Sequence, residues 1–214
     1  MTSPRALKLA CLISGGGRTM MNLCDCIDNG TLNASIDLVI ASHPDIAGIK
    51  LAEERGLSLR VVETNDNNSR DEMHDTITSM LKDAAIDLVC LCGYLRRLRI
   101  DKHLEGRVIN IHPALLPEFG GKGMYGMRVH RAVLATGRKF SGCTVHFVDE
   151  HYDHGPVILQ RTCPVRPDDD EEALAARVFE QECLAYPEAI RMIVSGRVKL
   201  EGGRVHIMPE RDTF

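Results

Sequence analysis

Short apolar runs alternate with segments of helical spacing in the first half of the chain. Runs typical of buried strands lie at residues 8–14, 35–42, 59–63 and 87–92. Segments whose apolar residues recur every three to four positions lie between them, at 19–29, 46–55 and 69–85, the last after a polar loop at 64–68. Nearly continuous apolar strands that are separated by helices are typical of a parallel sheet covered on both faces. The first half therefore predicts a Rossmann-like α/β arrangement.

The second half is less regular. Strand-like runs lie at residues 107–112, 140–148 and 157–164, and helical spacing at 129–136 and from the acidic run 168–172 through Pro187 to about 195. Residues 113–128 form a long loop, and Gly202-Gly203 separates two short strand-like runs, 198–201 and 204–208. A glycine pair between such runs indicates a hairpin. The fold class predicted for the whole chain is α/β, with a mostly parallel sheet, helices on both faces, and an irregular C-terminal half that ends in a small β-hairpin.

Composition excludes several classes of protein. Of 214 residues, 44% are hydrophobic and 26% charged, which is typical of a globular protein. The net charge of −4 and the absence of Trp argue against a nucleic-acid partner, which would favour a basic surface with aromatic stacking platforms. No run approaches the roughly 18 apolar residues of a membrane helix. The N-terminal segment lacks the features of a signal peptide, so we expect a cytoplasmic protein with no membrane partner.

The eight cysteines do not form a recognisable metal or disulfide pattern. Most lie inside apolar strand-like or helix-like runs, and no C-x-x-C pair occurs. Zinc is the alternative, but Cys24-x-Cys26 is too tight for finger-like spacing. We therefore expect small buried thiols in a reducing compartment, and no metal.

A glycine cluster joins the first predicted strand to the first predicted helix, at Gly15-Gly16-Gly17-Arg18-Thr19. Backbone N–H groups at such a helix start favour an anion, and glycines allow it to approach closely. The G-K-[ST] ending of a Walker loop is missing, and Met20 stands where a dinucleotide fingerprint would have its third glycine. These residues favour a single phosphate over a pyrophosphate, with a plain tight turn as the alternative.

Asn110 and His112 lie two positions apart at the end of a predicted strand. Their side chains therefore project to the same face, and ligands of open parallel sheets bind beyond the strand ends. An amide donor beside an imidazole suits a carbonyl that becomes an oxyanion. From the residues alone, a strand-end turn with a satisfied histidine is an equally good interpretation.

Two further clusters have both a structural and a functional interpretation. The loop at residues 149–156 is rich in carboxylates and imidazoles; it is either a solvated hairpin or the source of an acid that keeps His112 charged. His146, on the preceding strand, is a packed core residue or a hydrogen-bonding support. Arg96, Arg97, Arg99 and Lys102 form a basic cluster, which is either a solvated face or a site for an acidic ligand tail.

At these positions the chain resembles the phosphoribosylglycinamide formyltransferases, the folate-dependent enzymes of the third step of purine synthesis. The motifs are LISGGGRT, Ser69-Arg70, CGYLRRL, VINIHPALLP and TVHFVDEHYDHGPVILQ, and the resemblance runs from about residue 8 to 203. The order N-x-H-P, L-L-P and D-x-G-P is specific to the formyltransferase superfamily. Two features depart from many relatives: Gly16 and Arg18 replace an Asn and a Ser, and residues 120–128 are longer, as either a lid or a surface loop.

The resemblance implies a role for each site residue. The implied catalytic residues are Asn110, His112 and Asp153, with His146 as a supporting residue. The implied substrate-binding residues are Gly17, Arg18, Thr19 and Glu182. The implied folate-binding residues are Arg70, Leu95, Arg96, Arg97, Leu98, Asn110, Asp149 and Asp153. One domain, 1–214, is expected, with a phosphate-binding half at about 1–105 and a catalytic and folate-binding half at about 106–214.

The implied reaction is direct transfer of the formyl group of 10-formyltetrahydrofolate to the primary amine of glycinamide ribonucleotide, without a metal. Both partners are small molecules, and the chain is expected to be a monomer or a homodimer. A 10-formyltetrahydrofolate hydrolase usually has an extra N-terminal domain, and a methionyl-tRNA formyltransferase an extra C-terminal one, for which we expect no room here. A non-catalytic nucleotide-binding module would not need Asn110, His112 and Asp153 together.

Overall fold

The computed structural model describes residues 5–63 and 69–209, so the polar loop predicted at 64–68 lies outside the described residues. The chain divides into two compact units, Met1–Ile109 and Asn110–Phe214. The strands of the main sheet follow the hydrogen-bonded order β3-β2-β1-β4-β5-β6-β7, and β8-β9 form a separate two-stranded sheet. The predicted fold class is confirmed, whereas the single domain of 1–214 stays a prediction.

The first unit alternates strands and helices as the apolar pattern predicted. Its elements are β1 (Leu7–Ile13), α1 (Arg18–Asp28), β2 (Ala34–Ala41), α2 (Gly48–Glu54), β3 (Leu59–Val61), α3 (Arg70–Asp83) and β4 (Leu88–Leu91). The pairs β1–β2, β1–β4 and β2–β3 are all parallel. All four residues of β4 and the last five of β1 are buried, as expected for strands with both faces covered.

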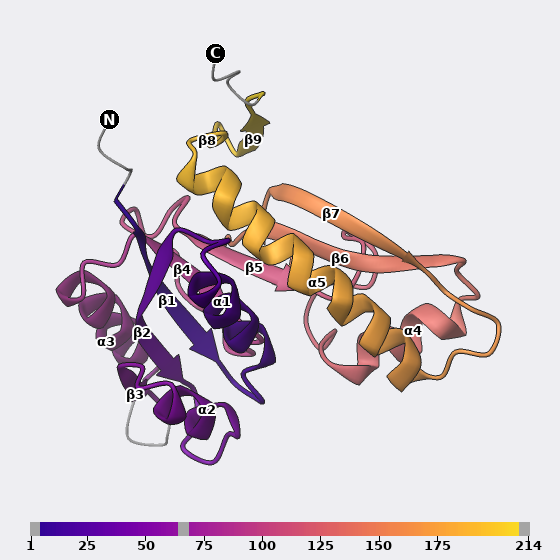
Figure 1. Cartoon of the computed structure of the whole chain (residues 1–214), viewed down its shortest axis with the longest axis horizontal. Coiled ribbons are helices and arrows are strands. Elements are labelled where there is room, and N and C mark those ends of the chain that lie inside the picture. The colour runs from indigo at the N-terminus through magenta and orange to yellow at the C-terminus, as the bar shows by residue number, and fades with distance from the viewer. Residues whose placement is uncertain (1–4, 64–68, 210–214) are drawn as a thin grey trace. The chain divides into compact units, whose positions relative to one another are not determined.

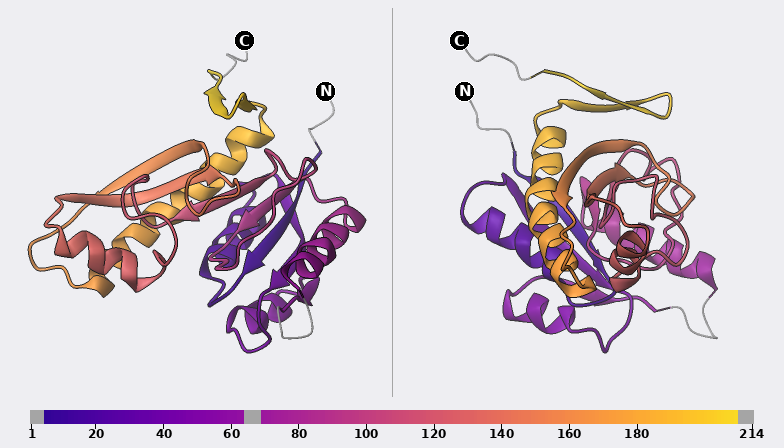
Figure 2. Two further views of the ribbon diagram at one scale, coloured as in Figure 1. Left: turned by 180° about the vertical axis from the view of Figure 1, so that it is seen from behind. Right: turned by 90° about the vertical axis from the view of Figure 1, so that its right-hand side faces the viewer.

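Helices cover both faces of the strands of this unit. Right-handed crossovers place α1 and α2 on one face, because β1, β2 and β3 follow one another in one direction, and place α3 on the other face, because the chain then returns to β4. Figure 1 shows α1 in front of the strands, and the view from behind in Figure 2 shows α3 in front. The start of α3 is a capping box, in which Ser69 and Glu72 satisfy each other's backbone N–H groups.

The second unit is built around an antiparallel strand pair and a long helix. Its elements are β5 (Val108–His112), which begins at the end of the first unit, α4 (Met127–Ala135), β6 (Phe140–Phe147), β7 (Val157–Pro164), α5 (Glu171–Val194), β8 (Val198–Glu201) and β9 (Arg204–Ile207). Figure 1 shows α5 lying across β6 and β7. Pro187 lies inside α5, so the helix continues through this residue as predicted.

Most of the cysteines are buried. Cys11, Cys24, Cys90, Cys92, Cys143 and Cys163 are buried, Cys26 and Cys183 are partly buried, and none of these eight is in a disulfide. Burial raises the pKa of the Cys143 thiol to about 12, with a further contribution from the nearby Glu182 carboxylate, so this thiol is unreactive at neutral pH. No helix of residues 5–63 and 69–209 is long and apolar enough to cross a membrane.

Candidate active site

The glycine cluster of the first unit forms a tight turn between β1 and α1. Gly17 has φ +73°, and a Cβ at this position would lie 3.0 Å from Gly48 Cα. Gly48 N donates to Gly15 O at 3.0 Å, which holds the turn against the start of α2. The positive φ and the close backbone approach both require glycine at position 17. Gly48 was missed from the sequence, where it lies inside an ordinary helix pattern.

The start of α1 has the chemistry of an anion site. No side chain caps the helix, and no acidic residue lies in its first turn, which begins at Arg18 and Thr19. The first N–H groups of a helix point out of its N-terminus, and the helix dipole adds positive potential there. The sequence therefore correctly located a turn of this kind, and the phosphate-binding roles of Gly17, Arg18 and Thr19 stay predictions.

The segment at residues 95–98 is fixed beside this glycine turn. Leu95 N donates to Ser14 Oγ at 3.0 Å, and Ser14 Oγ also accepts from Ser42 Oγ at 2.8 Å. Arg96 Nη2 donates to Ser42 O at 3.2 Å, which places part of the basic cluster over the end of β2. The two serines were missed from the sequence; their only signal is that each directly follows a buried strand. Leu98 is buried and Leu95 exposed, so only some of this segment faces solvent.

Arg70 is the first residue of α3, and it lies near the segment that follows β4. Arg99 contacts the carboxylates of Asp71 and Asp75 on α3. Arg99 N also donates to His74 Nδ1 at 3.2 Å. These contacts tie the start of α3 to Arg99, the residue that directly follows the predicted segment 95–98. They also show that Arg99 belongs to an ion-pair network on the protein rather than to an unoccupied basic cluster.

Asn110, His112 and Asp153 converge in the second unit. Asn110 Nδ2 lies 3.3 Å from Asp153 Oδ1, and His112 Nδ1 lies 3.5 Å from Asp153 Oδ2. The His112 side chain is 4% exposed and that of Asp153 11%. Asp153 adopts φ +53°, an uncommon conformation for a residue other than glycine, and one that is often found at functional sites. The hydrogen-bonded convergence favours the functional interpretation of Asn110 and His112 over that of a strand-end turn.

His146 orients the amide of Asn110. His146 Nδ1 lies 2.8 Å from the Phe147 carbonyl oxygen, which can only accept, so Nδ1 carries the hydrogen. Burial lowers the pKa of His146, which leaves the ring neutral and its Nε2 without a hydrogen at neutral pH. Asn110 Nδ2 can then donate to Nε2 at 3.1 Å. The neutral tautomer of His146 with its hydrogen on Nδ1 is therefore the form that can support Asn110.

Residues 119–121 of the long loop contact His112 and Asp153. His112 Nε2 donates to Phe119 O at 2.8 Å, and Gly121 N donates to Asp153 Oδ2 at 2.9 Å. A Cβ on Gly120 would collide with the Leu116 side chain and lie 3.1 Å from Asp153 Cβ. Both ring nitrogens of His112 therefore face acceptors, one a carbonyl and the other a carboxylate. The sequence marked residues 120–128 as a lid or a surface loop, but it did not indicate that residues 119–121 contact His112 and Asp153 through backbone groups.

His130 on α4 is a second buried imidazole near His112. Its Nδ1 has no hydrogen-bond partner among the described residues, and its side chain is buried. Burial lowers the pKa of His130, and the neighbouring His112 lowers it further. His130 is therefore neutral at neutral pH. Only its place on a short predicted helix distinguishes it in the sequence.

Asp149 and Glu182 have different surroundings. Asp149 lies in the loop after β6 and accepts from His151 N at 2.7 Å and from His154 Nδ1 at 2.6 Å. Partial burial would raise the pKa of Asp149, but these hydrogen bonds outweigh it and lower the pKa. Glu182 lies on α5 near Cys143, which projects from the opposite face of β6 to His146. The roles of Asp149 and Glu182 in binding stay predictions.

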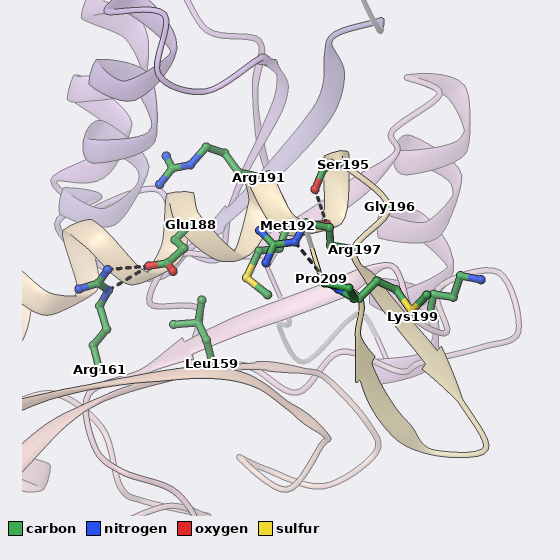
Figure 3. A pocket seen from close by; sticks show the side chains of 11 residues that line it. Leu159, Arg161, Glu188, Arg191, Met192, Ser195, Gly196, Arg197, Lys199 and Pro209 are labelled. Atoms are coloured by element: carbon green, nitrogen blue, oxygen red, sulfur yellow. Dashed lines mark hydrogen bonds and ion pairs between the residues drawn. The ribbon is translucent and has the colours of Figure 1, made fainter. Parts of the chain in front are cut away.

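A cavity of about 1020 Å³ lies elsewhere in the second unit, between β7, the end of α5 and the hairpin. Figure 3 shows Arg161, which donates to Glu188 Oε2 at 3.1 and 2.7 Å, and the hairpin residue Lys199. Arg161 lies opposite Cys143 in the β6–β7 register, and so belongs to the α5 face. This cavity is therefore separate from the group of Asn110, His112, His146 and Asp153.

Comparison with known proteins identifies the family. Residues 7–190 match the model of the family described as formyl transferase. The chain belongs to the formyl transferase family. A relative named phosphoribosylglycinamide formyltransferase, from Haemophilus influenzae, is 34% identical to it over 202 residues, which cover 94% of this chain and 93% of the relative. A chloroplastic protein of the same name from Vigna unguiculata is 34% identical over 210 residues, which cover 97% of this chain and 67% of the relative.

Solved structures agree with this assignment. The crystal structure of glycinamide ribonucleotide transformylase 1 from Symbiobacterium toebii superposes on this formyl transferase with a TM-score of 0.85 and 35% sequence identity, covering 95% of each chain. The family resemblance that was predicted from the motifs is therefore confirmed. The family uses a formyl donor derived from folate.

Proposed function

We propose that this formyl transferase moves the formyl group of 10-formyltetrahydrofolate to the primary amine of glycinamide ribonucleotide. The observation that carries the proposal is the hydrogen-bonded group of Asn110, His112, Asp153 and His146 in the second unit. It combines an amide donor, an imidazole and a carboxylate, which are the groups that acyl transfer through an oxyanion requires. Both substrates are small molecules, and the proposed reaction uses no metal.

In the proposed reaction, the amine nitrogen attacks the formyl carbon, and the carbonyl electron pair moves onto the oxygen. Asn110 donates to this oxyanion, and the positive charge of the protonated His112, whose ring nitrogens face Phe119 O and Asp153, stabilises the tetrahedral intermediate. The carbon–N10 bond then breaks as the carbonyl forms again. Asp153 accepts the proton that the amine loses. It passes this proton, through a water molecule, to N10. The products are formylated glycinamide ribonucleotide and tetrahydrofolate.

The geometry supports Asn110 as the oxyanion donor. One of its amide hydrogens is directed to His146 Nε2 at 3.1 Å, and the other lies at a longer 3.3 Å from Asp153 Oδ1. The longer bond is the weaker one, so a formyl oxygen can take this hydrogen while His146 keeps the amide in place. This use of the two amide hydrogens requires the neutral form of His146, which its burial favours.

The remaining residues bind the two substrates. Gly17, Arg18 and Thr19 hold the phosphate at the start of α1, and Glu182 lies near the glycinamide. Arg70, the segment 95–98 and the backbone of residues 149–153 hold the folate. The support for the first assignment is the uncapped helix start, which has no acidic residue in its first turn.

One assay tests the proposal directly. Enzyme and 10-formyltetrahydrofolate are mixed with and without glycinamide ribonucleotide, and the release of tetrahydrofolate is followed. We expect release only when the amine substrate is present. An equal rate of formate and tetrahydrofolate release without the amine would assign the protein as a hydrolase instead.

A further inference from the structure

The loop between β6 and β7 brings two imidazoles and a carboxylate together. Asp149, His151 and His154 each offer one ligand atom, and these three atoms lie within 4.8 Å of one another. His154 Nδ1 is 2.6 Å from Asp149 Oδ2, and His151 Nδ1 is 4.0 Å from Asp149 Oδ1. The two imidazole ring centroids are 5.3 Å apart. We propose that Asp149, His151 and His154 form a binding site for a divalent transition metal of the zinc type.

The donor set fits this class of ion. Two neutral imidazole nitrogens and one carboxylate oxygen are common zinc ligands, whereas magnesium and calcium prefer oxygen ligands. With zinc–nitrogen bonds of about 2.0–2.1 Å, ligand atoms around a tetrahedral ion lie about 3.4 Å apart. The separations of 2.6 Å and 4.0 Å lie on either side of that spacing, so side-chain rotations are needed to bring the three atoms onto one ion.

Exposure of the loop allows those rotations. The His151 and His154 side chains are 76% and 72% exposed, and that of Asp149 is 34% exposed. The backbone N–H of His151 donates to Asp149 Oδ1 at 2.7 Å, which fixes the carboxylate while its other oxygen stays directed at His154. When the ion binds, it takes the place of the hydrogen between His154 Nδ1 and Asp149 Oδ2, and the neutral ring carries its hydrogen on Nε2 instead. Water completes the coordination on the open side.

The site has a consequence for its neighbour in the chain. Asp153 lies between His151 and His154, and it contacts Asn110, His112 and Gly121 N. An ion that joins His151 to His154 closes a short ring around Asp153 and restricts the loop that carries it. The proposed metal therefore acts on the conformation of this loop, and it takes no part in the formyl transfer described above.

Cobalt provides a direct probe. Titration of untagged protein with Co²⁺ is expected to give the visible absorption of a tetrahedral site with imidazole ligands, saturating at one ion per chain, and Zn²⁺ is expected to displace it. His151→Ala and His154→Ala should each weaken Co²⁺ binding at least about tenfold, since even the loss of a residue that only supports a ligand costs about 10–100-fold.

His43→Ala is the matched control. His43 is also exposed and also lies near two carboxylates, with Nδ1 3.6 Å from Asp45 Oδ2 and Nε2 3.4 Å from Glu63 Oε1, but it has no second imidazole. We expect His43→Ala to bind Co²⁺ as the unmodified protein does. The proposal is overturned if the unmodified protein shows no stoichiometric binding, if both loop variants bind equally well, or if His43→Ala removes the binding. Circular dichroism confirms that each variant is folded.

Discussion

The amide of Asn110 donates in two directions, to His146 Nε2 at 3.1 Å and to Asp153 Oδ1 at 3.3 Å. An amide that is held from one side can turn its second hydrogen toward charge that develops during a reaction. At the residue scale, this makes Asn110 and its two partners the side chains whose replacement tests the chemistry most directly.

We expect Asn110→Ala to reduce kcat by about 10²–10³, which is the usual cost of losing one oxyanion donor. Asp153→Asn should also reduce kcat, because an amide keeps the shape of the carboxylate but cannot accept the proton of the amine. The double variant should lose less than the product of the two single effects, since both residues support one intermediate. Steady-state kinetics of the three variants measure this. Single variants with normal turnover would mean that the group is only strand-end architecture.

His146 is a positioning residue, and its replacement separates geometry from chemistry. His146→Ala removes the acceptor that holds Asn110, so we expect kcat to fall with little change in the KM of either substrate. His146→Gln, whose side-chain oxygen can accept from Asn110, should restore part of the loss. Measurement of kcat and KM for both variants tests this. The positioning role is wrong if Gln and Ala reduce kcat equally while both variants keep normal stability.

At the element scale, the turn between β1 and α1 depends on one backbone conformation. Gly17 has φ +73° and faces Gly48 Cα, while Gly15 and Gly16 have ordinary φ values and nothing within 4 Å of an added Cβ. The three glycines are equivalent in the sequence, but only the third is required by the structure.

We expect Gly17→Ala to lower the free energy of unfolding by roughly 1–2 kcal/mol, the usual cost of a left-handed conformation in a residue with a Cβ. The close approach to Gly48 adds to this cost, and the affinity for glycinamide ribonucleotide should fall as the turn shifts. Urea denaturation and ligand titration measure the two effects. Gly16→Ala is the matched control, and an equally large loss of stability in it would contradict the argument.

Arg18 tests the other property of this turn, its positive potential. Arg18→Ala should weaken binding of glycinamide ribonucleotide about tenfold or more, because it removes a charged donor from a phosphate at the start of α1. Binding of the folate should not change. Separate titrations with each ligand distinguish the two, and a weaker affinity for folate instead would show that the phosphate has been assigned to the wrong place.

At the scale of the whole molecule, buried histidines make stability depend on pH. Burial lowers the pKa of His74, His130 and His146, and nearby positive groups lower each of them further. As the pH falls through about 6.5, the ordinary histidine pKa, the unfolded chain takes up protons before the folded chain does. The stabilisation is therefore fully present above that pH and is lost as the pH falls toward the lowered values.

We expect the free energy of unfolding to be lower at pH 5.5 than at pH 7.5, by at most about 1.4 kcal/mol per pH unit for each histidine. Urea denaturation at both pH values measures it. The conservative variant His130→Asn removes one titrating group and should reduce the difference. Replacement of the exposed His206 should leave it unchanged. A stability that is constant, or that rises toward acid pH, would contradict the prediction.

The sequence by itself determined the order of the elements and much of the local chemistry. Apolar periodicity gave the strands and helices, because buried faces must repeat with the period of the element. The helix predicted to begin at Ser69 is α3, and its start is local because Ser69 forms a capping box with Glu72, three residues away. Asn110 and His112 gave a shared face, because positions two apart on a strand point the same way. Each of these conclusions depends only on interactions between residues that are close in the chain.

Only the tertiary structure decided which distant groups meet. The Asp153 side chain reaches that of Asn110 across 43 positions, which only the family resemblance had implied, and Gly121 N reaches Asp153 across 32 through a backbone group that no pattern of side chains reveals. The tautomer of His146 follows from a carbonyl and from burial, and the need for glycine at position 17 follows from the backbone at Gly48. Such features depend on packing between segments that are remote in the chain, where local periodicity and propensity carry no information about distance.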